Sequence, residues 1–476
     1  MERSAHDKIQ NRLSTGDAPG AGAGTTSKAT PGPAGIVSLD PQADPLTFLG
    51  GLVREYGDAV RYTTKFGPCF LFVHPAQVET ILHSENYRRA SLVKLMLGDG
   101  LLAIDGPRWR SQRRLMQKDF LPAALAKFVD LIAHHTARTV REWHAAAKAC
   151  QEVDVTGEMT RLTLRIIVDA LFSDDMGDED AARLCDAVTQ TINHLGSISW
   201  TIFGAAPRFT PDTASAFAGS KNWIDSKCRE MILRRRSQNS ADRPRDLLSL
   251  LIESEGDDPA ADQHLRDEIV TMLVGGHETT ALVLSWAWKL LAEHPSSAAQ
   301  LYEEVDAVLA GSPPPGADMP KLAWSRAIFQ EAMRLYPPVW YMARVATEAD
   351  VVDGHSIPRG ACVLVSAWFT HRHEAFWPRP QEFDPARFLK PAPLHRYAYL
   401  PFGGGRHQCL GMHFALLEGT MILSQLAQSF AVHPSPGQDI RPQPGITLRQ
   451  TQNMRATIEL RQGPIASSLG AREEAL

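Results

Sequence analysis

Residues 401–411 read Pro-Phe-Gly-Gly-Gly-Arg-His-Gln-Cys-Leu-Gly, and the residues after them, Met412 to Glu418, follow a helical pattern. Cys409 therefore lies just before the N-terminus of a predicted helix. Unpaired backbone N–H groups and the positive end of the helix dipole favour a thiolate at such a place. The glycines lack a Cβ, so the backbone can close around the sulfur and lie against a flat ligand. These features predict a ligating cysteine.

Three interpretations fit a glycine-rich loop with one cysteine: a thiolate ligand of haem iron, a phosphate-binding loop, and a buried structural cysteine. No Lys-Ser or Lys-Thr follows the glycines, which argues against a phosphate-binding loop. Thiolate ligation of haem requires a single cysteine presented by a loop that leads directly into a helix. We therefore expect Cys409 to bind haem iron, with a structural cysteine as the alternative.

The same segment resembles the haem-binding loop of the cytochrome P450 family. The family pattern Phe-x-x-Gly-x-Arg/His-x-Cys-x-Gly falls on Phe402, Gly405, His407, Cys409 and Gly411. The basic position is His407, and Arg406 stands one place earlier, so either side chain can approach a haem propionate. The resemblance implies heme b with an axial thiolate from Cys409, bound by a loop that includes Phe402, Gly405 and Gly411.

The composition limits the classes of protein to which the chain can belong. The chain has 476 residues, of which 44% are apolar and 22% charged, with a net charge of −5. There is no basic excess and no basic run at a terminus, so nucleic-acid binding has no support. The six cysteines lie far apart, without a CxxC pair or a zinc-ligand spacing. We expect a reduced, cytoplasmic protein.

The N-terminal residues bear on membrane attachment. Residues 1–35 are polar and rich in Gly, Ala, Ser, Thr and Pro. They lack both the run of about 18 apolar residues that spans a bilayer and the apolar core of a signal peptide. We expect a disordered tail over residues 1–35, a single domain over residues 36–465, a flexible tail over residues 466–476, and no membrane anchor.

The pattern of elements predicts a mainly α protein with small β-sheets (α+β). Short strand-like runs occur at residues 59–63 and 69–73 and return after residue 340, whereas residues 107–310 are mostly helical. The resemblance implies the cytochrome P450 fold, in which a long central helix passes over the haem and the cysteine loop lies beneath it.

Residues 264–293 contain no proline and predict one long helix, with Gly-Gly-His-Glu-Thr-Thr at residues 275–280 inside it. Each glycine in a helix interior costs roughly 1 kcal/mol relative to alanine. A backbone requirement, such as a local opening of the hydrogen-bond ladder, is one reason to tolerate the pair. The alternative is a packing contact at the glycines, with Glu278 on a solvated face.

An acid and a hydroxyl follow these glycines. Thr279 can hold an oxygen or a water, and Glu278 can pass protons from solvent, so the pair suits proton delivery to dioxygen. The segment, with Gly275 beside the cofactor, resembles the family pattern Ala/Gly-Gly-x-Asp/Glu-Thr-Thr/Ser at every position. Relatives that use peroxide usually lack this acid–alcohol pair. The resemblance therefore implies a monooxygenase that activates dioxygen.

Two more regions match the family. Glu331 and Arg334 lie three residues apart on one predicted helix face. The family's Pro-x-Arg-Phe element then falls on Pro385, Arg387 and Phe388. The resemblance implies that Glu331, Arg334 and Arg387 form a buried ionic triad behind the cysteine loop, with a structural rather than a catalytic role.

Haem carboxylates require cationic partners. Trp109 and Arg113 match the family's Trp-x-x-x-Arg element, and Arg344 matches a further propionate-binding arginine. Arginine suits this task through its forked donors. The alternative for residues 109–113 is the basic face of an amphipathic helix.

Electrons must come from outside the chain, because no reductase follows the last strand-like run. The resemblance implies a separate ferredoxin or flavodoxin-type partner, supplied with NAD(P)H electrons by a reductase. Arg110, Arg114 and Lys118 form a local positive patch that suits an acidic partner. The alternative is that part of this cluster only neutralises propionates.

The substrate pocket is assigned by analogy with the family, and its predicted lining is apolar. The residues are Leu97, Ile202, Val274, Val339, Trp340 and Met342. We expect a monomer that hydroxylates a hydrophobic small molecule of secondary metabolism. The alternatives are a redox-neutral isomerase or dehydratase, a peroxygenase, and a non-catalytic haem-binding sensor. The Glu278–Thr279 pair argues against the first three.

Overall fold

The computed structural model describes residues 28–37, 44–89, 94–174, 177–199, 211–256, 261–390 and 395–461. The predicted pocket residue Ile202 lies outside these ranges, and so do the predicted tails apart from residues 28–35. Within the described ranges, no helix combines the length and the apolar character that crossing a bilayer requires.

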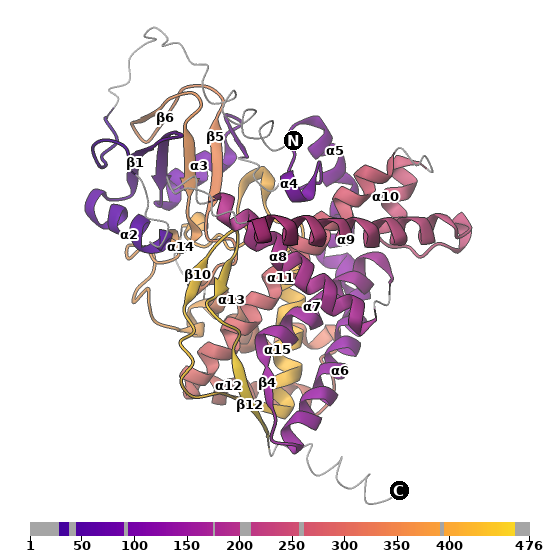
Figure 1. Cartoon of the computed structure of the whole chain (residues 1–476). Helices are drawn as coiled ribbons and strands as arrows, with labels where there is room; N and C mark the ends of the chain where they lie inside the picture. Colours follow the sequence, from indigo (N-terminus) through magenta and orange to yellow (C-terminus); the bar gives the residue numbers. More distant parts are fainter. Residues whose placement is uncertain are drawn as a thin grey trace, which may run out of the picture.

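A long helix, α11 (Asp262–Glu293), forms the centre of the helical part (Figure 1). Its buried residues lie on nearly every side, which is the pattern of a helix enclosed by protein. Its neighbours are α7 (Val155–Phe172), α9 (Pro211–Arg236), α13 (Ala323–Leu335) and α15 (Met412–Ser429). The largest apolar cluster surrounds these helices. The predicted long helix over residues 264–293 is confirmed.

The other helices of the described residues surround this group or join it to the sheets. They are α2 (Pro45–Tyr56), α3 (Pro75–His83), α4 (Lys94–Leu97), α5 (Pro107–Met116), α6 (Val129–Lys148), α8 (Asp178–Ser199), α10 (Leu247–Glu255), α12 (Pro295–Leu309) and α14 (Ala367–Thr370). The start of α5 has a local cause. Gly106 has a φ of 86°, which glycine adopts readily, and Pro107 follows in the first turn, where no N–H is needed.

The main sheet has the strand order β1-β2-β8-β5-β3. The strands are β1 (Ala59–Thr64), β2 (Gly67–Phe72), β8 (Cys362–Val365), β5 (Met342–Ala346) and β3 (Tyr87–Arg89). Strands β2 and β8 are parallel, and the other neighbouring pairs are antiparallel. Because β5 lies inside the sheet, Arg344 is fixed between Arg89 of β3 and Val363 of β8.

Three smaller sheets occur in the described part of the chain. One joins β4 (Glu152–Asp154), β12 (Arg455–Leu460) and β9 (Phe430–Pro434). The two-stranded sheets pair β10 (Pro442–Pro444) with β11 (Leu448–Gln450), and β6 (Asp350–Val352) with β7 (His355–Ile357). The predicted mainly α architecture with small β-sheets is confirmed.

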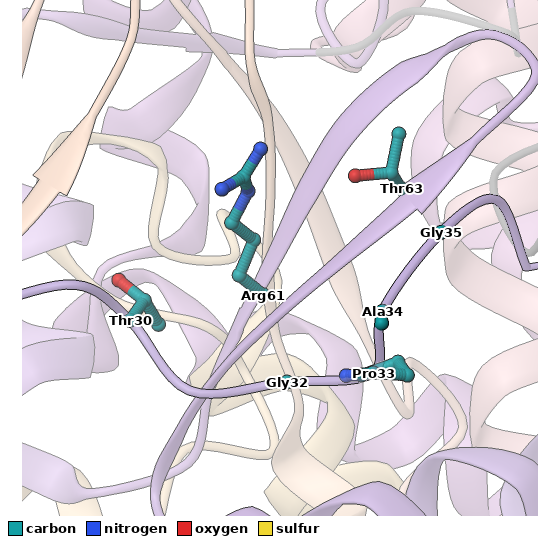
Figure 2. A pocket seen from close by; sticks show the side chains of 7 residues that line it. All are labelled: Thr30, Gly32, Pro33, Ala34, Gly35, Arg61 and Thr63. Atoms are coloured by element: carbon teal, nitrogen blue, oxygen red, sulfur yellow. The ribbon is translucent and has the colours of Figure 1, made fainter.

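Residues 28–37 lie against the β-rich part, although residues 1–35 were predicted to be a disordered tail. The Lys28 N–H donates to the Gly354 carbonyl at 2.7 Å, and the Arg61 N–H donates to the Pro31 carbonyl at 2.8 Å. A Cβ on Gly32 would lie only 1.7 Å from the Arg61 carbonyl oxygen, so glycine permits this close approach. A surface hollow of about 200 Å³ is lined by Thr30, Gly32, Pro33, Ala34, Gly35, Arg61 and Thr63 (Figure 2). The folded domain thus includes residues before 36.

Candidate active site

The cysteine segment forms a tight loop before α15. The Cys409 N–H donates to the Phe402 carbonyl at 2.9 Å. Gly403 and Gly405 have φ angles of 66° and 63°, in the left-handed region that favours glycine. A Cβ on Gly405 would lie 2.1 Å from the Leu82 carbonyl oxygen of α3. Glycine at this position therefore lets the loop pack directly on the backbone of α3.

The Cys409 sulfur lies in an enclosed but accessible space. Cys409 is an exposed residue, and it stands two positions before Gly411, which precedes the first turn of α15. Burial nevertheless raises the pKa of its thiol above the ordinary value, while the Gly411 N–H and the charge of Arg113 act to lower the pKa. Cys409 is thus surrounded by protein atoms, although part of its surface is accessible. Its sulfur therefore faces an interior space. The predicted stabilisation of the thiolate by the helix terminus does not by itself outweigh burial.

A carboxylate orients two basic side chains beside the loop. Asp105 lies 2.7 Å from Nε2 of His407 and 3.3 Å from Nε of Arg89. Burial acts to raise the pKa of Asp105, but His407 and Arg89 more than offset it and lower the pKa to about 2. Arg89 and Asp105 were not identified from the sequence, because neither belongs to a local motif.

Arg344 is the most deeply placed of these cations. It is 7% exposed, and the acceptor found for its guanidinium among the described residues is the backbone carbonyl of Ala343, at 3.0 Å. Burial, and then the charge of Arg89, lower the pKa of Arg344 to about 10. Asp105 acts in the opposite direction, but a buried guanidinium with one acceptor still has donors free for a further anion. The propionates of haem would supply that charge, so the residues present fit the cofactor that the resemblance implies.

Trp109 and Arg113 of α5 also reach the loop. The Trp109 ring is buried and packs edge-on against His407, with ring centroids 4.5 Å apart. Arg113 donates from Nη1 to the Gln408 carbonyl at 2.7 Å. Arg110, in contrast, is exposed. Helix α5 therefore has one face directed at the cysteine loop and another directed at solvent.

The glycine-rich turn of α11 presents an accessible strip on a helix that is buried along most of its length. Met272, Gly275, Gly276 and Thr279 lie at helical spacings of three and four, so they share one face. All four are at least partly exposed. The Thr279 hydroxyl donates to the Gly275 carbonyl at 2.9 Å. The strip thus combines open backbone with one hydroxyl group.

The predicted opening of the hydrogen-bond ladder is wrong, since α11 is a continuous α-helix. A Cβ on Gly276 would lie 2.6 Å from Cγ1 of Ile167 on α7, so this glycine is required where the two helices touch. Gly275 has no such crowding. The nearest atom to its Cβ position is Cδ1 of Leu102, at 3.7 Å. The packing alternative therefore explains Gly276, and Gly275 stays accessible.

Glu278 is buried, whereas it was predicted to pass protons from solvent. Its Oε1 accepts from Nε of Arg449 at 2.7 Å and from the Thr447 hydroxyl at 3.1 Å. Arg449 also donates to Oδ1 of Asn193 on α8, at 2.8 Å. The segment that leads into β11 packs on this side of α11 and excludes solvent. The sequence did not indicate this pair because its members are 171 positions apart.

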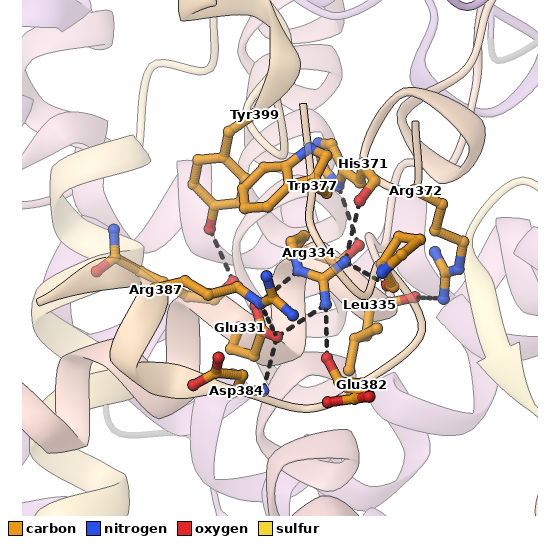
Figure 3. Close-up of polar contacts among 12 residues, drawn as sticks. Glu331, Arg334, Leu335, His371, Arg372, Trp377, Glu382, Asp384, Arg387 and Tyr399 are labelled. Atoms are coloured by element: carbon orange, nitrogen blue, oxygen red, sulfur yellow. Dashed lines mark hydrogen bonds and ion pairs between the residues drawn. The ribbon is translucent and has the colours of Figure 1, made fainter. Parts of the chain in front are cut away.

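The structure brings Glu331, Arg334 and Arg387 together (Figure 3). Arg334 donates to both carboxylate oxygens of Glu331, at 2.7 and 2.8 Å, and both side chains are fully buried. Nε of Arg387 lies 3.4 Å from Oε1 of Glu331. Arg334 also donates to three backbone carbonyls, those of His371, Pro380 and Glu382. The triad therefore ties α13 to the segment before the cysteine loop.

The predicted pocket residues occupy different environments. Val274 and Met342 are half-buried, and Val339 is 40% exposed. The Met342 sulfur lies 3.3 Å from the Cβ position of Gly403 in the cysteine loop. These three residues are accessible to a ligand.

Leu97 and Trp340 are core residues instead. Leu97 belongs to the main apolar cluster. Trp340 packs in another cluster, and its Nε1 donates to the Gly445 carbonyl at 2.9 Å. Leu102 is 44% exposed, and its Cδ1 lies 3.7 Å from the Cβ position of Gly275. The family analogy placed the region 92–103 at the pocket, but it did not single out Leu102.

Comparisons with known proteins agree with this geometry. The family described as cytochrome P450 matches residues 36–456. Cyclooctatin synthase of Streptomyces melanosporofaciens is 36% identical over 422 residues, which cover 85% of this chain and 89% of the relative. Cyclooctat-9-en-7-ol 5-monooxygenase of the same organism is 31% identical, with 83% and 86% covered. Pentalenene oxygenase of Streptomyces avermitilis is 29% identical, with 88% and 93% covered. The chain therefore belongs to the cytochrome P450 family.

Proposed function

We propose that this P450 monooxygenase hydroxylates a hydrophobic natural-product intermediate, using dioxygen and electrons from a separate redox partner. When bound, heme b would supply the oxygen-activating chemistry, with its iron held by the Cys409 sulfur. One observation carries the proposal. Cys409 and the strip of α11 are both accessible, and α11 packs on α15, the helix that Cys409 precedes, which supports our inference that the two belong to one site.

Cys409 is the proposed iron ligand, and the cations beside it are the proposed propionate partners. Arg344 is a buried cation with few acceptors, which supports this role. His407 is oriented by its contact with Asp105. Trp109 and Arg113 complete the set from α5. Phe402, Gly405 and Gly411 shape the loop face toward the cofactor, and Gly275 shapes the opposite face.

Thr279 is the proposed proton-holding group. Its hydroxyl donates to the Gly275 carbonyl, and a rotation about χ1 would redirect it toward dioxygen or a water. Glu278 is the proposed source that replaces the proton. Since Glu278 is paired with Arg449, this transfer requires Arg449 to turn away, and Asn193 is a second partner that can hold it.

The iron ligand can be tested before any substrate is known. We expect the reduced, carbon monoxide-treated protein to show a strongly red-shifted Soret band that is lost in Cys409→Ser. A wild-type protein without haem, or with an unshifted band, would contradict the proposed function.

The proton role is tested by coupling efficiency. Substrates are first identified by the spin-state shift that they cause. Thr279→Ala should then release a larger share of reducing equivalents as peroxide, whereas Thr279→Ser, which keeps the hydroxyl, should stay near the wild type. Equal coupling in all three proteins would remove Thr279 from the mechanism.

The substrate class rests on the accessible residues and on the relatives. Val274, Val339 and Met342 are apolar and accessible, and a hydrophobic ligand suits such a lining. Two relatives have names that identify them as a monooxygenase and an oxygenase, and both come from Streptomyces. We therefore propose a terpene, polyketide or aromatic scaffold as the substrate.

A basic surface of α5 and the turn after it supports an acidic redox partner, such as a ferredoxin or flavodoxin. Arg110, Arg114 and Lys118 are exposed, and none of them forms an ion pair with another described residue. Charge reversal at all three positions should slow reduction by the partner in a salt-dependent way. Arg141→Glu, at an exposed position of α6, is the control. Unchanged reduction kinetics would contradict this assignment. We propose that the protein works in this way as a cytoplasmic monomer.

A further inference from the structure

The C-terminal end of α3 lies against the cysteine loop. The Cβ position of Gly405 is 2.1 Å from the Leu82 carbonyl oxygen, so the two backbones are in direct contact. The next loop residue, Arg406, donates from Nη2 to the Ser84 carbonyl at 3.0 Å and pairs with Glu85 at 2.9 Å. The loop therefore rests on the end of this helix and on the two residues that follow it.

Tyr397 packs on the same part of the loop. It belongs to η8 (Arg396–Ala398), a short 3-10 helix, and is 3% exposed. A Cβ on Gly404 would lie 2.3 Å from Cε1 of Tyr397, so the ring touches the loop backbone. The Tyr397 hydroxyl oxygen accepts the Gly405 N–H at 3.0 Å. Tyr397 thus fixes the turn by a ring contact and by a hydrogen bond.

The Tyr397 hydroxyl has a second partner on α3. Its oxygen lies 2.6 Å from Nε2 of His83, an exposed residue. Because the oxygen already accepts the Gly405 N–H, the buried hydroxyl hydrogen needs an acceptor of its own. All three groups are satisfied when Nε2 of His83 accepts this hydrogen and the ring proton of His83 is on Nδ1. The contacts then form one chain, His83–Tyr397–Gly405, from the surface to the cysteine loop.

The position of Gly405 bears on that of Cys409. The Gln408 N–H donates to the Gly405 carbonyl at 3.3 Å, and the Cys409 N–H donates to the Phe402 carbonyl at 2.9 Å. Gly403 and Gly405 both have left-handed φ angles, and glycine has many other conformations available. Contacts from outside the loop are therefore needed to select this one conformation.

We propose that His83 is a positioning residue for the iron ligand. Through the Tyr397 hydroxyl it holds the Gly405 amide, and thereby the loop that presents Cys409. The inference rests on the proposed function for the role of Cys409, whereas the hydrogen-bonded chain lies among the described residues. It gives a part in the site to a residue that precedes Tyr397 by 314 positions and that no sequence motif of the loop includes.

The first experiment measures the Gly405 amide by hydrogen exchange of the holoprotein, in peptides covering residues 403–408. Tyr397→Phe should speed exchange about tenfold, because the N–H loses its acceptor while the ring contact stays. His83→Phe keeps a ring but offers no acceptor to the hydroxyl, and it should speed exchange about threefold. His83→Gln offers an amide oxygen and should restore exchange to near the wild-type rate. Thr80→Ala, at an exposed position one turn earlier on α3, is the control and should change nothing.

The second experiment measures the orientation of the ligand through the carbon monoxide spectrum of the reduced protein. Tyr397→Phe and His83→Phe should each raise the share of haem with an unshifted Soret band, by about threefold in His83→Phe. The double variant should add little to Tyr397→Phe, because both changes act on one hydrogen-bonded chain. His83→Gln should return the share to near that of the wild type. Ile252→Ala removes a buried side chain of α10 and is the control for a loss of stability alone. Below its unfolding temperature it should leave the share unchanged.

Unchanged exchange in His83→Phe would overturn the inference. A change in exchange without a change in the spectrum would also overturn it, because it would show a contact that does not position the ligand. So would additive effects of the two single changes, or an equal unshifted share in Ile252→Ala. If Tyr397→Phe does not accumulate as folded protein, His83→Phe and His83→Gln still decide the outcome. Failure of the proposed function is distinguishable, since the wild-type protein itself would then lack haem or the shifted band.

Discussion

Removing the Arg334 guanidinium should be among the most destabilising single changes in this protein. Arg334→Met leaves Glu331 buried without its main partner, and it leaves the carbonyls of His371, Pro380 and Glu382 without a donor. It also removes the cation that lies 5.1 Å from the centre of the Trp377 ring. The variant therefore loses an ion pair, three backbone contacts and a ring contact at once.

The magnitude follows from these contacts. Breaking a buried ion pair from one side typically costs about 3–5 kcal/mol. Glu331 keeps the Asp384 N–H at 2.9 Å and Arg387 at 3.4 Å, which places the ion-pair loss near the lower limit. The unsatisfied carbonyls add to it, so we expect a loss of about 4–6 kcal/mol in the free energy of unfolding. In urea this corresponds to a midpoint shift of about 2 M.

Two other arginines on the same stretch of chain provide matched comparisons. Arg379 pairs with Glu382 and Asp384, but its side chain is 61% exposed, so Arg379→Met should cost about 0–1 kcal/mol. Arg387→Met should lie between the two, because its side chain is 9% exposed and its ion pair is longer. The assay is urea unfolding of the holoproteins, followed by far-ultraviolet circular dichroism.

An Arg334 variant within about 1 kcal/mol of the Arg379 variant would refute this reasoning. If Arg334→Met does not accumulate as folded protein, the comparison of Arg387→Met with Arg379→Met still decides the outcome. Equal midpoints for those two variants would show that burial of the triad does not set its contribution.

Three further predictions concern backbone contacts and pH. Gly276→Ala should lower the free energy of unfolding by about 1–3 kcal/mol, because the added Cβ clashes with Ile167. In urea unfolding, the double variant with Ile167→Ala should lose less free energy than the two single variants combined. Gly405→Ala should lower the haem-to-protein ratio after gel filtration, because its left-handed φ and the contact with the Leu82 carbonyl both exclude a Cβ; an unchanged ratio would count against this role. The pKa of Glu268 is raised from 4.5 to about 7 in the folded protein, so its contribution to stability is full below pH 4.5 and is lost as the pH rises through 7. Glu268→Gln should therefore gain up to about 3 kcal/mol on the wild type between pH 5 and pH 8, measured as a growing difference in Tm, and a constant difference would contradict the assignment.

The sequence predicted well what depends on short spacing. The loop around Cys409, the pair Glu331 and Arg334, and the long helix with its glycines are all encoded within a few residues of one another. Local patterns fix such features because helical periodicity and turn residues act over short distances. The family resemblance then supplied the fold that arranges them.

The contacts that the sequence did not predict join residues remote in the chain. Arg449 reaches Glu278 across 171 positions, and Asp105 contacts His407 from another element. Polarity alone suggested that Glu278 faces solvent, whereas a neighbouring segment covers it. Analogy with the family predicted Trp340 as a ligand contact, but its indole fills a core. Such outcomes depend on which surfaces meet in three dimensions.

The segment 28–37 has a consequence for handling the protein. Strand β1 is one of the two edge strands of the main sheet. The segment 28–37 is hydrogen-bonded to it in two places: the Arg61 N–H donates to the Pro31 carbonyl, and the Val37 N–H donates to the Thr63 carbonyl at 2.7 Å. An uncovered outer strand offers free hydrogen-bonding groups to other chains and promotes self-association. A chain that begins at residue 28 should stay dispersed at high concentration, whereas a chain that begins at residue 38 should aggregate.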